Sequence, residues 1–352
     1  MSTEFRKILF GIFLGVILIV AVCLLIARNK PASPVEIDSG YREVMGTFAR
    51  VLVVAPNKGT AQKCIDAAFE QLQQVDKSMS AHDPQSEIGT VNRLASKEPV
   101  KVSESTFDVL ERSVHFSRLS NGAFDVTVGP LVELWRHAQD ANRIPTDAAL
   151  KQTLSKVGFE KLILDANEKT IRFAVDGMKL DLGGIAKGYA VDMAVEAMKA
   201  AGARGGMVDA GGNIRCFGTP PKEKTHWLIG LQDPNVTDEQ MKADRTILTL
   251  KFTDNAVATS GDYRRFVVIG GRRHSHIINP VAGQSSESLA SVTIICPNAT
   301  DADALATAVT VMGKEKGLAF IERMPDVEAI LITPAPDFKR TQTAGAEKYI
   351  KK

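Results

Sequence analysis

The sequence lacks the features that mark several common classes of protein. It has only four cysteines, Cys23, Cys64, Cys216 and Cys296, and no two of them form a C-x-x-C pair. This spacing favours buried apolar side chains for the last three, over zinc ligands or a disulfide framework. The formal net charge is only +2, too weak a field to indicate a nucleic-acid partner. Internal repeats and low-complexity tracts are also missing.

The chain does contain one long apolar run, at its N-terminus. Residues 8–27 form an uncharged stretch of twenty residues, and Arg6 and Lys7 precede it. A helix of this length spans about 30 Å, enough for the hydrocarbon core of a bilayer. We therefore expect residues 1–28 to be one uncleaved transmembrane helix in the inner membrane, with the rest of the chain in the periplasm. Cleavage as a signal peptide and lipidation at Cys23 are the alternatives.

Composition divides the remainder into a linker, a large domain and a tail. Prolines and serines in residues 29–40 indicate a short extended linker. Residues 41–340 are expected to form one large domain or two fused subdomains, followed by a tail at 341–352. Apolar periodicity and capping residues predict helices at 60–79, 105–122, 147–156, 186–201 and 301–312. Strands are predicted at 47–54, 162–164, 170–173, 179–181, 206–208, 227–231, 246–252, 256–260, 266–269, 291–296 and 327–332. Hairpins mixed with helices predict an α+β fold of largely antiparallel sheets with packed helices.

The most informative segment runs from Asp181 to Ala190, with the sequence DLGGIAKGYA. A predicted strand ends on the acid, turns through Gly183 and Gly184, and enters a helix with Lys187 in its first turn. Glycines let backbone N–H groups approach a ligand, and a helix N-terminus favours an anion. The spacing matches neither a Rossmann turn nor a P-loop, so the segment predicts a phosphate or pyrophosphate site of another kind. A tight strand-to-helix turn with an ordinary surface lysine is the alternative.

A carboxylate and a hydroxyl stand at helical spacing in the last predicted helix. Asp303 and Thr307 are four residues apart, so both project from one face. Oxygen ligands of this kind suit Mg²⁺, which also keeps positions for water and phosphate. The alternative is an acid favoured by the helix dipole, next to a surface threonine.

Two histidines, His274 and His276, lie near arginines between predicted strands. At a spacing of two they are expected on the same strand face, where a histidine can serve as a base, a phosphate partner or part of a metal pair. Because no third nitrogen or sulfur ligand lies close in sequence, zinc is not expected. A hairpin with a basic tip is the alternative.

Weaker signals come from two further turns. Asp209 leads into Gly211 and Gly212, which is either a second place where backbone meets a ligand or a simple turn. Asp125 follows a helix end and is either a ribose or base acceptor or a turn acid.

Taken together and in this order, these segments resemble the ApbE family, the FAD:protein FMN transferases. The matching stretches cover essentially the whole chain after the anchor, 41–340: Met45-Gly46-Thr47, Ser86-Glu87 with Asn92, Gly122 to Asp125, Val128-Gly129-Pro130, Asp181 to Ala190, Gly211-Gly212, Thr259 to Arg264, His276 to Pro280, and Ala302 to Thr307. The resemblance implies an ApbE-like, T-fold-related domain.

The resemblance also implies a reaction and roles for its residues. It implies an extracytoplasmic, Mg²⁺-dependent enzyme that splits FAD at the pyrophosphate, moves FMN onto a threonine or serine hydroxyl of a target protein and releases AMP. Asp303, Thr307 and the backbone carbonyl of Gly184 would hold the metal, and Lys187 would face the pyrophosphate. His276 is the candidate base, with water bound at Asp303 as the rival.

Further positions match those that line the FAD site in the family: Met45, Ser80, Ala81, His82, Asp125, Gly184, Lys187, Gly211, Gly212, Ser260 and His276. Two positions depart from the family pattern. His82 stands where some relatives carry tyrosine and is expected to stack on a ring of the cofactor. Asn213 stands where aspartate is common, which leaves it a supporting role at best.

The expected acceptors are subunits of membrane redox complexes that carry covalent FMN, such as the sodium-pumping NADH:quinone reductase or its Rnf relatives. One alternative function is a Mg²⁺-dependent FAD pyrophosphatase, which would use the same site with water as the acceptor. Another is a membrane-tethered FAD-binding protein, although binding alone does not require the oxygen pair Asp303 and Thr307. A structural module without flavin affinity is the last alternative.

Overall fold

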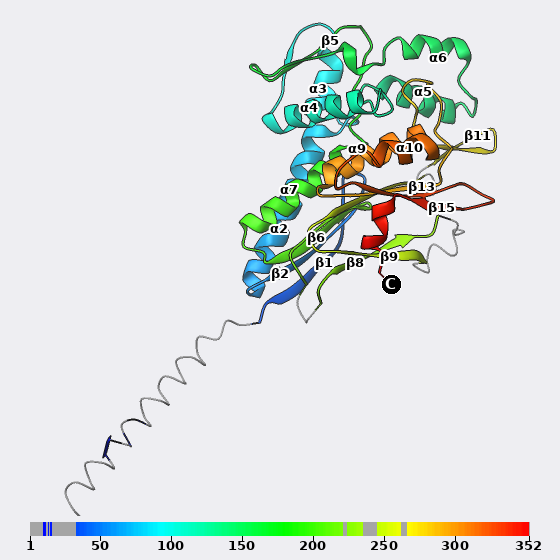
Figure 1. The fold of residues 1–352 in the computed structure, drawn as a ribbon. Helices are drawn as coiled ribbons and strands as arrows, with labels where there is room; N and C mark the ends of the chain where they lie inside the picture. The colour runs from blue at the N-terminus through cyan, green and yellow to red at the C-terminus, as the bar shows by residue number, and fades with distance from the viewer. Residues whose placement is uncertain are drawn as a thin grey trace, which may run out of the picture.

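One antiparallel sheet runs through the molecule and carries its largest core (Figure 1). The computed structural model describes residues 10, 11, 13, 15, 33–220, 224–234, 245–261 and 266–351. Within these residues the sheet has eight strands, each antiparallel to its neighbours. In spatial order they are β1 (Val35–Val44), β2 (Thr47–Ala55), β6 (Gly205–Ala210), β7 (Asn213–Phe217), β10 (Ala256–Gly261), β13 (Ser291–Cys296), β14 (Glu328–Ile332) and β15 (Arg340–Gln342).

Helices cover one face of this sheet (Figure 1). They are α2 (Lys58–Met79), α7 (Ala186–Ala200) and α9 (Ala299–Met312), with α10 (Lys314–Ile321) beside α9. The apolar stripe predicted for α2 is buried as expected from its helical period: Cys64, Ala68, Leu72, Val75 and Met79. On β2, Val51 and Val53 alternate with less buried residues and enter the same core.

A separate hairpin covers the other face. β8 (Trp227–Gln232) pairs with β9 (Thr246–Phe252), and the short helix η2 (Ala344–Tyr349) contacts β9. Their apolar side chains form a second cluster with strands of the large sheet, including Trp227, Ile229, Leu250, Phe252, Val257 and Ile295. Because β13 is buried along its whole length, its sequence SVTIIC shows no alternation of apolar and charged residues.

A second layer lies above α7 and α9 in Figure 1. Its helices are α3 (Glu87–Leu94), α4 (Glu104–Leu119), α5 (Gly129–Asp140), α6 (Asp147–Leu154) and η1 (Phe159–Lys161). A small sheet joins them, in the order β3 (Val100–Lys101), β5 (Thr170–Phe173) and β4 (Leu162–Asp165). The hairpin of β11 (Phe266–Ile269) and β12 (Arg272–Ser275) packs against α5. The α+β class with largely antiparallel sheets is confirmed.

Several boundaries predicted from the sequence are wrong. Residues 35–40, assigned to the linker, belong to β1, because pairing with β2 satisfies a backbone whose side chains are mostly polar. Residues 340–349, assigned mostly to a tail, form β15 and η2. The strand predicted at 179–181 is only an isolated parallel bridge between Val128 and Lys179.

The helix predicted at 105–122 is α4, which starts one residue earlier and ends three residues earlier. Its N-cap is Ser103, whose hydroxyl accepts a hydrogen bond from the backbone N–H of Thr106 at 3.4 Å. Three helices, α3, α5 and α10, and five strands, β1, β3, β7, β12 and β15, were not predicted from the sequence.

The cysteine prediction is confirmed for the described residues. Cys64, Cys216 and Cys296 are free and buried. Burial raises the pKa of each thiol, so these side chains behave as apolar core groups.

The membrane anchor was predicted at residues 8–27, and all but four of these positions lie outside the described residues. Among the residues that are described, we find no helix that is both long enough and apolar enough to span a bilayer.

Leu72 provides a test of the helix-on-sheet core. Its side chain is fully buried between α2 and the sheet. We expect Leu72→Ala to lower the free energy of unfolding by about 2–5 kcal/mol, because it removes apolar contact and leaves a cavity. Gln73→Ala, at an exposed neighbour on the same helix, should change it by roughly 0.5 kcal/mol or less. Urea denaturation of both variants measures the difference, and equal midpoints would contradict this packing.

Candidate functional site

A cavity of about 550 Å³ opens above the ends of the sheet strands, where α7 and α9 meet the second layer. Segments from eight parts of the chain line it, and they are far apart in sequence. The polar lining residues are Thr47, His82, Asp125, Asp181, Lys187, Asn213, Thr259, Ser260, His276, Asp303 and Thr307. The apolar ones include Phe124, Val126, Val128, Val132, Ile277 and Ile278.

The glycine turn brings α7 against α9 at the floor of this cavity. The Asp181 carboxylate accepts a hydrogen bond from the Gly183 N–H at 2.8 Å, which closes the turn before the helix. A Cβ on Gly184 would lie 2.9 Å from Thr307 Oγ1 and 3.2 Å from the Phe124 ring. Only glycine therefore fits between the turn and α9.

A second glycine, Gly188, allows the same close approach in the first turn of α7. A Cβ there would clash with the Ala299 carbonyl and would lie 2.8 Å from Asp303 Cβ. Because Gly188 has no side chain, its N–H reaches Asp303 and donates a hydrogen bond to Oδ2 at 3.0 Å. The sequence motif thus places a buried carboxylate at the N-terminus of a helix, where an anion is favoured.

The Asp303 carboxyl is buried at this end of the cavity, and the groups around it shift its pKa in opposite directions. Burial raises the pKa of its carboxyl above the ordinary value, while Lys187, the Gly188 N–H and the Asn213 side chain act in the opposite direction. The Lys187 Nζ lies 3.9 Å from Oδ2 and donates to the Gly183 carbonyl at 2.7 Å. Lys187 therefore stands between the glycine turn and the carboxylate.

Asn213 contributes an unsatisfied oxygen next to this carboxylate. It begins β7, is only 4% exposed, and makes a side-chain hydrogen bond to Asp303. Its Oδ1 has no hydrogen-bond partner among the described residues. A buried carbonyl oxygen at a cavity wall is costly unless a ligand group completes it. Asn213 therefore lies in contact with Asp303, and its supporting role stays a prediction.

The oxygens of Asp303, Thr307 and Asn213 at this end of the cavity can hold a hard cation. In the part of the chain that the structure describes, no cluster of three or more His, Cys, Asp and Glu side chains could bind a metal by itself. One carboxylate with neutral oxygens is the kind of set that suits Mg²⁺, which keeps water or phosphate as its other ligands. The residues thus fit the metal that the resemblance implies.

The two histidines separate, contrary to the expectation that they share a strand face. β12 ends at Ser275, so His276 lies beyond it, exposed and lining the cavity. His274 is buried within β12, where its Nδ1 pairs with Glu287 Oε1 at 2.8 Å and its ring lies 5.4 Å from that of Trp135. Of these two histidines, only His276 lines the cavity.

Asp125 lines the cavity, but its oxygens are already used. Its Oδ1 accepts hydrogen bonds from the N–H and the hydroxyl of Thr127, at 2.8 and 2.7 Å, and Oδ2 accepts from the Phe159 N–H at 2.9 Å. Burial raises the pKa of the Asp125 carboxyl, against these hydrogen bonds. These contacts favour the turn acid over the ribose or base acceptor.

The remaining predicted residues divide into two groups. His82, Gly184, Gly211 and Ser260 line the cavity. Met45, Ser80, Ala81 and Gly212 do not, but each lies within two positions of a lining residue. Met45 has a positive φ of 54°, and its N–H donates to Asp76. The apolar wall was missed by sequence reasoning, because Phe124, Val126 and Ile278 resemble ordinary core residues.

The buried Asp303 carboxyl predicts a pH dependence of stability in metal-free protein. Since its pKa is raised on folding, its favourable contribution is complete below the ordinary value of about 4 and is lost as pH rises through the raised pKa. In excess chelator, Asp303→Asn should therefore have a higher melting temperature than wild type near pH 7 and a similar one near pH 4.

The matched control is Asp301→Asn. Asp301 lies on the same helix but pairs with Arg112. This variant should gain no stability at pH 7. If Asp303→Asn also gains none, the carboxylate is not an unfavourable buried charge.

Comparisons with known proteins show to which family this chain belongs. The ApbE family model matches residues 45–331. The FAD:protein FMN transferase of Treponema pallidum is 34% identical, and the alignment covers 90% of this chain and 90% of that protein. The FAD:protein FMN transferase of Vibrio cholerae is 30% identical, and the alignment covers 94% of this chain and 97% of that protein. The crystal structure of the ApbE protein of Thermotoga maritima superposes with a TM-score of 0.80 at 30% identity, over 91% of this chain and 100% of that one. The flavin transferase ApbE from Vibrio cholerae gives 0.75, with the same coverage. The chain belongs to the ApbE family.

Proposed function

We propose that this protein is an FAD:protein FMN transferase that moves FMN from FAD onto a threonine or serine hydroxyl of a target flavoprotein and releases AMP. The acceptor oxygen forms a phosphoester bond to the FMN phosphorus. The bond from that phosphorus to the AMP oxygen breaks, and AMP leaves with the electron pair. The observation that carries the proposal is the joint placement of Asp303, Thr307, Lys187 and the glycine turn at one end of the cavity.

Phosphoryl transfer depends mainly on positioning and charge neutralisation, and this end of the cavity supplies both. Asp303, Thr307 and the backbone carbonyl of Gly184 would hold Mg²⁺, with Asn213 beside them. When bound, Mg²⁺ would supply positive charge to the phosphate oxygens of FAD. Lys187 adds a second positive charge and the N-terminus of α7 a partial one, so charge that develops on the departing AMP phosphate is stabilised.

The acceptor hydroxyl must lose a proton, and His276 is the proposed base. It is exposed at the cavity, directly after β12, and its neighbours Ser275 and Ile277 are buried. An exposed imidazole on a fixed backbone can take a proton at one ring nitrogen and pass it to solvent. Water held at Asp303 is the rival base.

The apolar wall provides room for the flavin ring system. Phe124, Val126, Ile277 and Ile278 line the same cavity as the polar end. His82, from the turn after α2, also lines it and is proposed to stack on a ring of FAD. A cavity with one apolar and one polar region matches a molecule with aromatic rings joined by a pyrophosphate.

The proposed acceptors are flavin-carrying subunits of a membrane redox complex, such as the sodium-pumping NADH:quinone reductase or its Rnf relatives. The proposed location is the inner membrane, with the N-terminal anchor holding the enzyme domain in the periplasm. A tether raises the effective concentration of enzyme near such subunits.

The first test is mass spectrometry of the full chain incubated with FAD, Mg²⁺ and the soluble domain of such a subunit. We expect the acceptor to gain the mass of one FMN, with AMP released. Asp303→Ala or excess chelator should lower the rate by roughly 100-fold or more, because charge neutralisation at the phosphates is lost. Mg²⁺ should also raise the melting temperature of wild type, but not that of Asp303→Ala. Free FMN with an unmodified acceptor would instead indicate a pyrophosphatase.

His276→Ala tests the base separately from binding. FAD affinity, measured by quenching of flavin fluorescence, should stay near the wild-type value. The transfer rate should fall by about 10²- to 10⁴-fold, the usual contribution of a general base. Wild-type transfer by this variant would exclude His276 as the base and leave water at Asp303. His274→Ala is not a suitable control, because that histidine is buried against Trp135.

A further inference from the structure

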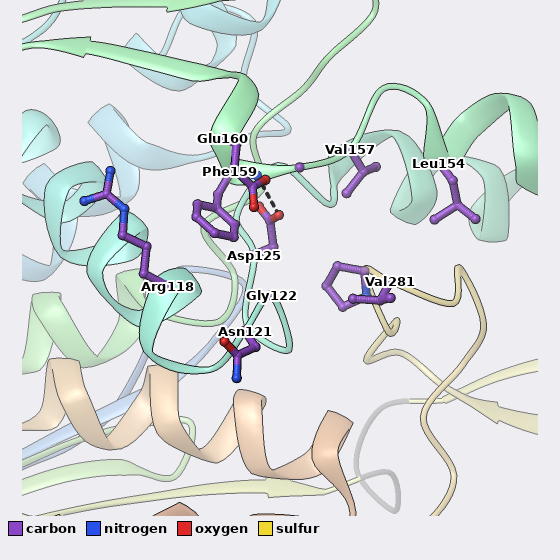
Figure 2. Close-up of a pocket in the computed structure, with 11 residues that line it drawn as sticks. Arg118, Asn121, Gly122, Asp125, Leu154, Val157, Phe159, Glu160 and Val281 are labelled. Carbon is purple, nitrogen blue, oxygen red and sulfur yellow. Dashed lines mark hydrogen bonds between the residues drawn. The ribbon is translucent and has the colours of Figure 1, made fainter.

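A second cavity, also of about 550 Å³, adjoins the first and has no role in the function proposed so far (Figure 2). Three segments form it: the end of α4, the stretch from α6 to η1, and the turn after His276. Its lining residues are Arg118, Asn121, Gly122, Asp125, Leu154, Val157, Gly158, Phe159, Glu160, Pro280 and Val281.

The two cavities share a wall. Asp125 and Pro280 line both of them, and both residues are buried. Asp125 is fixed on each side, by Thr127 in its own turn and by the Phe159 N–H across the second cavity. Figure 2 shows the Asp125 carboxylate pointing toward Phe159, with the dashed hydrogen bond between them. A ligand in the second cavity therefore lies next to the proposed flavin site without entering it.

The second cavity has an apolar end and a polar end. Leu154, Val157 and Val281 lie at one end in Figure 2, and Arg118 and Glu160 lie toward the other. Arg118 and Glu160 are exposed, and neither makes an ion pair among the described residues. The cavity is thus shaped for an occupant with both apolar and hydrogen-bonding groups.

Val281 is presented by a rigid turn although 69% of it is exposed. The Asn279 side chain accepts hydrogen bonds from the N–H groups of Val281 and Ala282, at 2.9 and 3.0 Å. The indole of Trp135 donates to the Gly283 carbonyl at 2.8 Å. Val281 is therefore an apolar group at the mouth of the cavity, on a turn that hydrogen bonds hold in place.

The chemistry of the proposed reaction requires such a surface. The acceptor is a protein, so its hydroxyl arrives with flanking residues on both sides, and these must lie outside the cavity that holds FAD. Water and small alcohols would compete unless the enzyme holds the acceptor backbone next to the phosphate. The second cavity shares Asp125 and Pro280 with the first, so a segment bound there lies beside the flavin site.

We propose that the second cavity binds the polypeptide segment that flanks the target hydroxyl of the acceptor. This inference rests on the proposed transferase function and adds where the protein substrate docks. The segment places an apolar side chain against Leu154, Val157 and Val281, and hydrogen-bonding groups toward Arg118 and Glu160. Its hydroxyl-bearing residue then passes over Pro280 into the flavin cavity, toward His276.

Val281→Asp is the test, because this side chain lies outside the flavin cavity and its exposure allows the variant to fold. The assay uses saturating FAD and, as acceptor, the soluble domain of the flavin-carrying subunit. The KM for this acceptor should rise about tenfold or more, since a charge replaces an apolar anchor. The kcat at saturating acceptor and the affinity for FAD should stay unchanged. Leu228→Asp, at a 49% exposed leucine on the distant strand β8, should leave all three quantities unchanged.

The possible outcomes distinguish failure of the docking site from failure of the proposed transferase function. A wild-type KM for the acceptor in Val281→Asp would overturn the docking site while the transferase stands. Weaker FAD binding in this variant would assign the second cavity to FAD and also overturn the inference. If wild type only hydrolyses FAD and never labels the acceptor, the transferase function fails, and the docking site with it.

Discussion

The site depends on one contact, between the N-terminal turns of α7 and α9. Gly184 and Gly188 let the backbone at the start of α7 contact the side chains of α9. The Gly188 N–H then donates a hydrogen bond to the Asp303 carboxylate. Without this contact, Thr307 would lie away from the glycine turn and Lys187 away from the carboxylate. Since both helices rest on the large sheet, the sheet in turn fixes the distance between them. The fold therefore positions the chemistry through a packing interaction that tolerates no extra methyl group.

Burial on both faces of the sheet makes this platform rigid. Helices fill one side and the β8–β9 hairpin with η2 fills the other, so β13 has no exposed face. Two of the strands that reach the cavity, β7 and β10, are neighbours in this sheet and carry Asn213 and Ser260 to it. A rigid support of this kind lets exposed residues such as His276 and Val281 stay in place without burial of their own.

The sequence predicted elements whose signal is local and missed features that depend on distant contacts. The α2 stripe, with Leu72 at its centre, follows from period alone. β1 is polar along most of its length, and only pairing with β2 makes it a strand. The Asp303–Thr307 pair was visible at helical spacing, but the position of Asn213 beside it required the β6–β7 turn. His274 and His276 could not be told apart, because the strand end at Ser275 is set by its partner β11.

Two adjoining cavities with a common wall also have a kinetic meaning. Asp125 and Pro280 separate the hollows without closing either, so each can be filled while the other is occupied. In the proposed reaction, donor and acceptor can then be bound at the same moment, and the phosphoryl group would pass directly from one to the other. Such a geometry needs no flavin held covalently on the enzyme between two half-reactions. It is the arrangement of a sequential, ternary-complex mechanism and not of a ping-pong one.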